Sequence, residues 1–218
     1  MTATVRESFR EAGFVRLGPI VPEHELDSLR SLCDRVLGEW AARTKQFVSL
    51  AGEIPESLVT VVSPEAMAPE LNETKFAQSA RLMAAEICDC EPDDMLMGWR
   101  VFVKPVGGHG TPWHQDAAYR APPHIGVSMF VPLDPVLSEI SCIRYLSGSH
   151  AGGLQPHVLE HGHYIAEKVA DTVPVLCPLA PGEASLHHCL TLHSTGANDG
   201  EQPRRALAAV FQPRLAKG

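Results

Sequence analysis

The period of the hydrophobic positions divides the chain into two parts. Two stretches of the first 94 residues repeat their apolar positions every three or four residues, as one face of an amphipathic helix requires. This spacing predicts one helix that begins at Pro22 and another over 75–88. Residues 6–18 predict a short helix that ends at Gly13 and is followed by a strand.

Residues 44–74 carry three prolines and show no clear period. A segment of this length without regular structure is uncommon in a compact domain unless it has a function. We therefore expect it to lie near the mouth of a site.

From residue 95 onward, short apolar or alternating runs are separated by turns rich in glycine and proline. The candidate strands are 96–104, 112–118, 125–132, 143–146, 173–177, 184–188, 190–193 and 205–211. Short strands after a helical part predict a mainly β protein, a double-sheet jelly roll (cupin-like) with the N-terminal helices packed outside it. We expect a single domain over 1–218, with a helical part and variable loop in 1–94 and the jelly-roll core in 95–214.

Composition and charge exclude several classes of function. The formal net charge of −8 and the lack of a basic stripe argue against a nucleic-acid partner. The chain has neither the apolar run of a signal peptide nor a stretch long enough to span a membrane, so we expect a cytoplasmic protein without a membrane partner. Its six cysteines are scattered, and the pair Cys88 and Cys90 has no matching second pair, which favours reduced thiols over disulfides or zinc.

The chemistry concentrates in the stretch Pro112–Asp116. His114 and Asp116 are two residues apart, so on an extended strand their side chains leave the same face. If the fold brings His193 to them, the three side chains form a 2-His-1-carboxylate site, which suits non-haem Fe(II). The alternative is a buried histidine paired with an aspartate, and an unrelated loop histidine.

Arg204 follows His193 by eleven residues, across a turn rich in glycine. A hairpin at this turn would place Arg204 on the strand that pairs with the strand of His193. Arginine binds carboxylates through two parallel hydrogen bonds, and an oxygenase that uses an oxoacid cosubstrate needs such a group. The alternative is a surface pair of arginines at 204 and 205.

Several ordered motifs together resemble the phytanoyl-CoA dioxygenase family. The resemblance extends over nearly the whole chain and rests on 13–17, 22–26, 113–116, 148–150, 182–184, 193–198 and 204–206. It implies an Fe(II)- and 2-oxoglutarate-dependent oxygenase on a double-stranded β-helix, which converts 2-oxoglutarate and O2 to succinate and CO2.

The resemblance also implies roles for individual residues. His114, Asp116 and His193 correspond to the iron ligands of the family. Arg204 corresponds to the arginine that binds the distal carboxylate of 2-oxoglutarate, assisted by Thr195. Lys104 matches a lysine that contacts the cosubstrate in some members, although a solvated lysine at a strand end is the alternative.

Other histidines are expected to support the structure. His187 and His188 lie on one predicted strand, where alternation turns only one of them inward, and a core or supporting role fits either better than metal ligation. His150 is expected to be structural.

The substrate is weakly encoded. The carboxylate of Asp116 favours hydroxylation over halogenation, which in related oxygenases requires a small residue there. The short chain favours a small or medium metabolite, and the oligomeric state is open. Besides parts of 44–74 and 151–170, the candidate pocket residues are Trp99, Arg100, Trp113, Gln115, Tyr119, Arg120 and Arg144.

Two other functions remain open from the sequence. One is a cupin-like metal enzyme without 2-oxoglutarate, such as an isomerase or a cosubstrate-independent dioxygenase. The other is a non-catalytic barrel that binds a small molecule.

Overall fold

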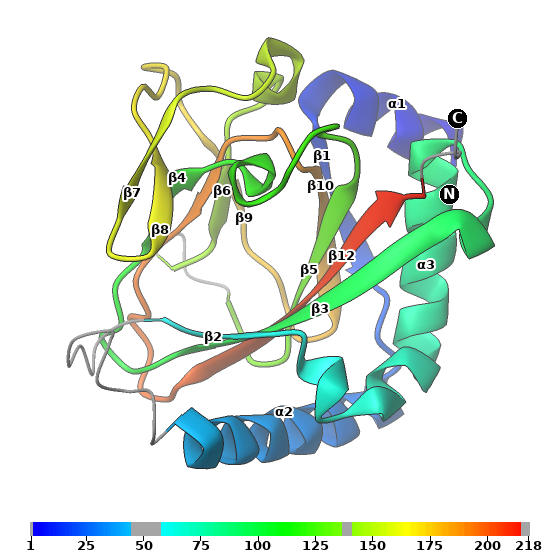
Figure 1. Ribbon diagram of the computed structural model, residues 1–218, viewed down its shortest axis with the longest axis vertical. Coiled ribbons are helices and arrows are strands. Elements are labelled where there is room, and N and C mark those ends of the chain that lie inside the picture. Colours follow the sequence, from blue (N-terminus) through cyan, green and yellow to red (C-terminus); the bar gives the residue numbers. More distant parts are fainter. Residues whose placement is uncertain (1, 45–57, 137–140, 215–218) are drawn as a thin grey trace.

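Two antiparallel sheets form the core of the jelly roll, and helices cover the outer face of the larger one (Figure 1). The computed structural model describes residues 2–44, 58–136 and 141–214. The helices are α1 (Ala3–Ala12), α2 (Glu23–Thr44) and α3 (Lys75–Cys88). In the described part of the chain, no helix is long and apolar enough to cross a membrane.

The larger sheet has six strands and the smaller sheet has four. The larger sheet runs in the order β1 (Phe14–Pro19), β10 (Glu183–His188), β5 (Val127–Pro132), β12 (Arg204–Pro213), β3 (Met95–Lys104) and β2 (Val59–Val62). The smaller sheet runs in the order β4 (Thr111–His114), β11 (His193–Thr195), β6 (Ile143–Tyr145) and β9 (Val175–Cys177). A separate hairpin consists of β7 (His157–Glu160) and β8 (His163–Ala166).

Alternation along β12 separates the two faces of the larger sheet. Leu207, Ala209 and Phe211 are fully buried in the core cluster that includes the helices. Ala206 and Ala208 point the other way, into a cavity between the sheets. The apolar face anchors the sheet, because each buried Leu or Phe contributes about 1.5–3 kcal/mol. The opposite face is left to form a site.

The N-terminal helix is joined to the sheet at Gly13. Thr2 caps α1 by accepting a hydrogen bond from the Val5 amide, and Gly13 ends the helix at φ 79°. A Cβ atom at Gly13 would lie 2.4 Å from Nδ1 of His150, so only glycine fits. His150 in turn lies 3.2 Å from the Arg10 carbonyl oxygen through Nε2. This packing agrees with a structural role for His150.

The predicted elements are confirmed except at several boundaries. The strand expected over 112–118 ends at His114, because Asp116 begins a 3-10 helix, η4 (Asp116–Tyr119). The strand expected over 190–193 was displaced, since β11 begins only at His193. Three strands were not predicted, namely β2 within 44–74 and the hairpin β7–β8. The first 94 residues also supply β1 and β2 to the larger sheet, while the division of the chain at residue 94 stays a prediction.

The hairpin expected between His193 and Arg204 was wrong. Strand β11 pairs with β4 and β6, whereas β12 pairs with β3 and β5, so the turn carries the chain from one sheet to the other. Buried Asn198 fixes this crossover, because its Nδ2 donates to the carbonyl oxygens of Lys104, Pro105 and Gln202 at 2.8–3.1 Å. These bonds tie the turn to the end of β3 instead of closing a hairpin.

Candidate metal centre

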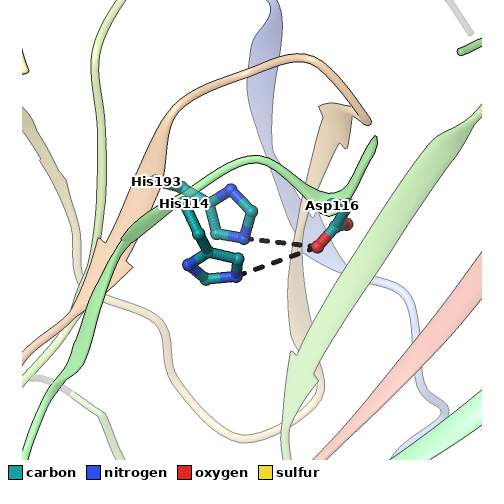
Figure 2. Close-up of side chains that lie close together, drawn as sticks. All are labelled: His114, Asp116 and His193. Atoms are coloured by element: carbon teal, nitrogen blue, oxygen red, sulfur yellow. Dashed lines mark ion pairs between the residues drawn. The ribbon is translucent and has the colours of Figure 1, made fainter. Parts of the chain in front are cut away.

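His114, Asp116 and His193 converge on one point between the sheets (Figure 2). His114 ends β4, and His193 lies directly opposite it on β11. Asp116 begins η4, and its Oδ1 lies 3.9 Å from Nε2 of His114 and 3.7 Å from Nε2 of His193. Among the described residues this is the one group of three metal-binding side chains with donor atoms within 4.8 Å of one another.

The backbone fixes the orientation of both imidazole rings. Nδ1 of His114 lies 2.8 Å from the Pro112 carbonyl oxygen, and Nδ1 of His193 lies 2.9 Å from the Thr191 carbonyl oxygen. A carbonyl can only accept, so each Nδ1 carries the hydrogen and each Nε2 turns a free lone pair toward Asp116. Burial lowers the pKa of both histidines, which keeps them in the neutral form that binds metal.

Asp116 uses its second oxygen to contact the larger sheet. Oδ2 accepts a hydrogen bond from Ser128 Oγ and lies 3.2 Å from Nε2 of His187. Ser128 and His187 are direct neighbours on β5 and β10. Burial by itself would raise the pKa of Asp116, but the hydrogen bond from His187 and the surrounding histidines hold it well below its usual value. The carboxylate is therefore ionised and oriented before any ligand binds.

A buried tyrosine holds His187 in place. The Tyr145 hydroxyl lies 3.2 Å from Nδ1 of His187 and 2.8 Å from Oγ of Ser185. If Nε2 of His187 donates to Asp116, then Nδ1 accepts from Tyr145, so the chain of bonds selects one tautomer. This outcome agrees with a supporting role for His187. Ser128 was missed, although it is a lone serine in an otherwise apolar strand, and nothing in the sequence marked Tyr145.

Lys104, Thr195 and Arg204 line the same cavity as the three candidate ligands. Lys104 is the last residue of β3 and lies opposite Arg204 on β12. Its Nζ donates to Thr195 Oγ1 at 2.9 Å and to the Gly196 carbonyl oxygen at 2.6 Å. Arg204 donates through Nη1 to the Ser141 carbonyl oxygen at 3.0 Å. Arg204 therefore approaches the cavity from the larger sheet. The predicted hairpin would instead have placed it beside His193.

The pKa of Lys104 is lowered far enough for its amine to titrate near neutral pH. Burial, together with the neighbouring charges of Arg204 and Arg144, lowers the pKa of Lys104 to about 7. Its partners are oxygen atoms of Thr195 and Gly196 and not a carboxylate. An anion that enters this end of the cavity would supply the missing negative charge.

The cavity has a volume of about 510 Å³ and opens between the two sheets. Of the candidate pocket residues, Arg100, Tyr119 and Arg120 line it. The candidate segment 44–74 contributes Leu58, Thr60 and Val62 to the lining, and the candidate segment 151–170 contributes Gly162 and His163. Residues 45–57 of the first segment lie outside the described residues.

The other candidate pocket residues do not line the cavity. Gln115 is fully buried and its amide binds the backbone at Gly153, Leu190 and Gln155. Trp99 is buried beneath the sheet, where its Nε1 donates to Asn72 Oδ1. Trp113 packs in a small apolar cluster, and Arg144 is likewise absent from the lining.

None of the six cysteines, which all lie in the described ranges, forms a disulfide, and none joins the candidate metal centre. Burial raises the pKa of Cys33 and Cys88 to about 12, so both are protonated near neutral pH. This agrees with the expectation of reduced thiols.

Comparison with known proteins gives a consistent result. The family model for phytanoyl-CoA dioxygenase (PhyH) matches residues 9–206. The peroxisomal phytanoyl-CoA dioxygenase of Homo sapiens is 22% identical, over 97% of this chain and 68% of the human protein. The methylphosphonate hydroxylase of Gimesia maris is 27% identical, over 100% of this chain and 83% of that protein.

A solved structure is similar along the whole length of this chain. EvdO2 from Micromonospora carbonacea var. aurantiaca is 31% identical with a TM-score of 0.83, over 100% of this chain and 93% of that chain. A second structure of EvdO2, complexed with 2-oxoglutarate, is 30% identical with a TM-score of 0.82 and the same coverage.

The hydrogen bond from His187 to Asp116 gives a first prediction. We expect His187→Ala to weaken Mn(II) binding by about 10- to 100-fold, because a ligand without its supporting hydrogen bond is less well oriented. Isothermal titration of the metal-free protein with Mn(II) measures this change. His24→Ala, which removes an exposed histidine, serves as the control and should keep the wild-type affinity. Equal affinities in both variants would contradict the supporting role.

Proposed function

The chain belongs to the phytanoyl-CoA dioxygenase family, and from this premise we propose that it is an Fe(II)- and 2-oxoglutarate-dependent oxygenase. In this proposal His114, Asp116 and His193 hold the iron. Arg204 and Lys104 bind the distal carboxylate of 2-oxoglutarate, and Thr195 positions Lys104. The reaction is hydroxylation of a small or medium metabolite.

One observation carries the proposal, namely that a single cavity contains both groups of residues. Two neutral histidines and one ionised carboxylate leave open positions on an iron, as the 2-His-1-carboxylate arrangement does in oxygenases. At the edge of the same cavity, Lys104 and Arg204 lie opposite each other in register, and both donate to neutral oxygen atoms. The charge of Asp199 acts on Arg204, but within the described ranges neither cation forms an ion pair with a carboxylate. Two such cations suit a dicarboxylate cosubstrate. The 2-oxoglutarate complex of EvdO2, a relative at 30% identity, supports this assignment.

The residues of this chain bind and orient, and the bound iron supplies the oxidising chemistry together with O2 and 2-oxoglutarate. His187, held by Tyr145, favours the ionised form of Asp116. The hydrogen bonds from His114 and His193 to backbone carbonyl oxygens keep both rings in the tautomer that can bind metal through Nε2. The candidate ligands are largely shielded from solvent, with side-chain exposures of 12%, 22% and 7% for His114, Asp116 and His193. This shielding limits the access of water to the reacting centre.

Separate observations support hydroxylation and a modest substrate size. The relative from Gimesia maris is a hydroxylase of methylphosphonate by its name, and Asp116 retains the carboxylate that halogenation would lack. The cavity of about 510 Å³ must hold cosubstrate and substrate together, which favours a small or medium molecule.

A direct test separates this proposal from its alternatives. Under anaerobic conditions, Fe(II) and 2-oxoglutarate should together produce a weak visible charge-transfer band, and in air the protein should slowly release succinate. A cupin-like enzyme without this cosubstrate would show neither signal, and neither would a non-catalytic binding barrel. Absence of both signals from the iron-loaded protein would refute the proposed function.

Arg204 gives a prediction of its own. Arg204→Ala should weaken 2-oxoglutarate binding by about ten-fold or more, because one charged hydrogen-bonding partner contributes about 1.5–3 kcal/mol. Mn(II) binding should be unchanged, since Arg204 is not a proposed ligand. Titration of the charge-transfer band measures the first affinity and calorimetry the second. Arg43→Ala, on the exposed end of α2, is the control. Normal cosubstrate affinity in Arg204→Ala would show that Arg204 has another role.

The pKa of Lys104 predicts a pH dependence. Below about pH 7 the amine is already charged, so 2-oxoglutarate binding needs no added proton. Above that pH the free protein holds a neutral amine, and the bound carboxylate raises its pKa again, so binding takes up a proton. The dissociation constant should therefore rise with pH above about 7, by at most about ten-fold per unit.

Calorimetry in two buffers of different ionisation enthalpy measures this proton uptake directly. Lys104→Met should bind more weakly and lose the uptake. An unchanged uptake in Lys104→Met would assign the titration to another group.

A further inference from the structure

We propose that the cavity contains a second anion-binding subsite, formed by Arg100 and Arg120, which recognises an oxyanion group on the substrate. The inference rests on the proposed function, because it assigns the cosubstrate to the other cationic end of the cavity. The class of ligand is an acid, either a carboxylate or a phosphate-type group, attached to a largely apolar body.

Arg100 faces the cavity because of its place on β3. It lies on the same face of the strand as Lys104, four residues further on, and its neighbours across the sheet are Ala208 and Val62. Its guanidinium lies beside Gly98, where an added Cβ atom would be 3.9 Å from Nη1. That Nη1 donates to the Trp99 carbonyl oxygen at 2.7 Å. The backbone thus holds the guanidinium along the cavity wall.

Arg120 lines the same cavity from the loop that follows η4. It follows η4, four residues after Asp116, and lines the cavity with Arg100. Its Nη1 is buried and has no hydrogen-bond partner in the part of the chain that the structure describes. A buried guanidinium nitrogen without a partner is costly and rare in folded proteins. A ligand with acceptor oxygens would supply the missing partner.

The two arginines are close enough to repel each other. Burial lowers the pKa of Arg100, the charge of Arg120 lowers it further, and Glu65 and Asp116 oppose this effect. Within the described ranges neither arginine forms an ion pair, and Glu65 lies beyond ion-pair distance. Arg205, which also lines the cavity, shows the contrast, because it binds Asp134 at 2.8 Å. Arg100 and Arg120 therefore line one cavity without a direct ion pair to any described carboxylate.

The cosubstrate cannot neutralise this pair while it occupies the other end. Lys104 and Arg100 are four residues apart on one strand, which places their Cα atoms about 13 Å apart. Among the described residues, Asp116 is the one carboxylate that lines the cavity, and it is committed to the proposed iron. Glu65, whose charge also acts on Arg100, does not line the cavity. An anionic group on the substrate would supply the negative charge that this lining lacks.

The rest of this wall defines the body of the substrate. Phe102, Phe130, Val62 and Val210 line the cavity beside Arg100, and Ala206 and Ala208 form its floor. An acid with an apolar body would place its charge on the two arginines and its carbon chain along this surface. Guanidinium groups bind carboxylates and phosphates alike, so the test includes both.

The test uses the whole protein, loaded with Fe(II) and saturated with 2-oxoglutarate without oxygen, so that the first anion site is filled. Calorimetric titrations with hexanoate, hexyl phosphate and the neutral hexanamide measure the second site. We expect one equivalent of at least one anion to bind, at least ten-fold more tightly than hexanamide. Arg100→Gln and Arg120→Gln should each weaken this binding by about ten-fold or more. Arg43→Ala should leave it unchanged, and the stronger anion identifies the acid class.

Three results would overturn the subsite: equal binding of hexanamide, full anion affinity in both glutamine variants, or no saturable binding of either anion. The charge-transfer band with 2-oxoglutarate shows in every sample that the protein is folded and loaded. A wild-type protein that gives this band but binds neither anion would lose only the subsite. A wild-type protein that gives no band would instead lose the proposed function.

Discussion

The architecture depends on one carboxylate that is shared between two sheets. Oδ1 of Asp116 faces the histidines of the smaller sheet, and Oδ2 is held by Ser128 and His187 of the larger one. Neither sheet contains a complete site by itself. Because Asp116 lies in a short turn and not in a strand, its position is set by these contacts more than by local backbone preference. The geometry of the candidate centre therefore depends directly on the distance between the two sheets.

The structure brings the candidate site residues together, but not through the local structure that the sequence predicted. His114 and Asp116 were grouped because a strand would turn them to one face, yet the strand ends at His114 and the first turn of η4 brings Asp116 to the same point. Arg204 was placed beside His193 by an assumed hairpin, but it reaches the cavity from the other sheet. Residue type and spacing indicated the chemistry, while the crossover depended on distant contacts of Asn198 that no local pattern encodes.

The supporting groups were harder to predict for a physical reason. Ser128 is a single polar residue in an otherwise apolar strand, and Tyr145 lies in a strand of only three residues, so neither gives a periodic signal. Their roles arise from bonds between segments that are far apart in the chain, such as Tyr145 with Ser185 and His187. The larger sheet, by contrast, was largely predictable, because alternation separates its core face from its cavity face along β3 and β12.

The placement of both cationic ends of the cavity on β3 has a consequence for molecular recognition. Lys104 and Arg100 extend from one continuous strand that is hydrogen-bonded on both sides, by β12 and by β2. Their separation is set by the backbone rise and cannot adapt as a loop would. In the proposed assignments, the strand therefore sets the spacing between the site for the cosubstrate carboxylate and the site for the anionic group of the substrate.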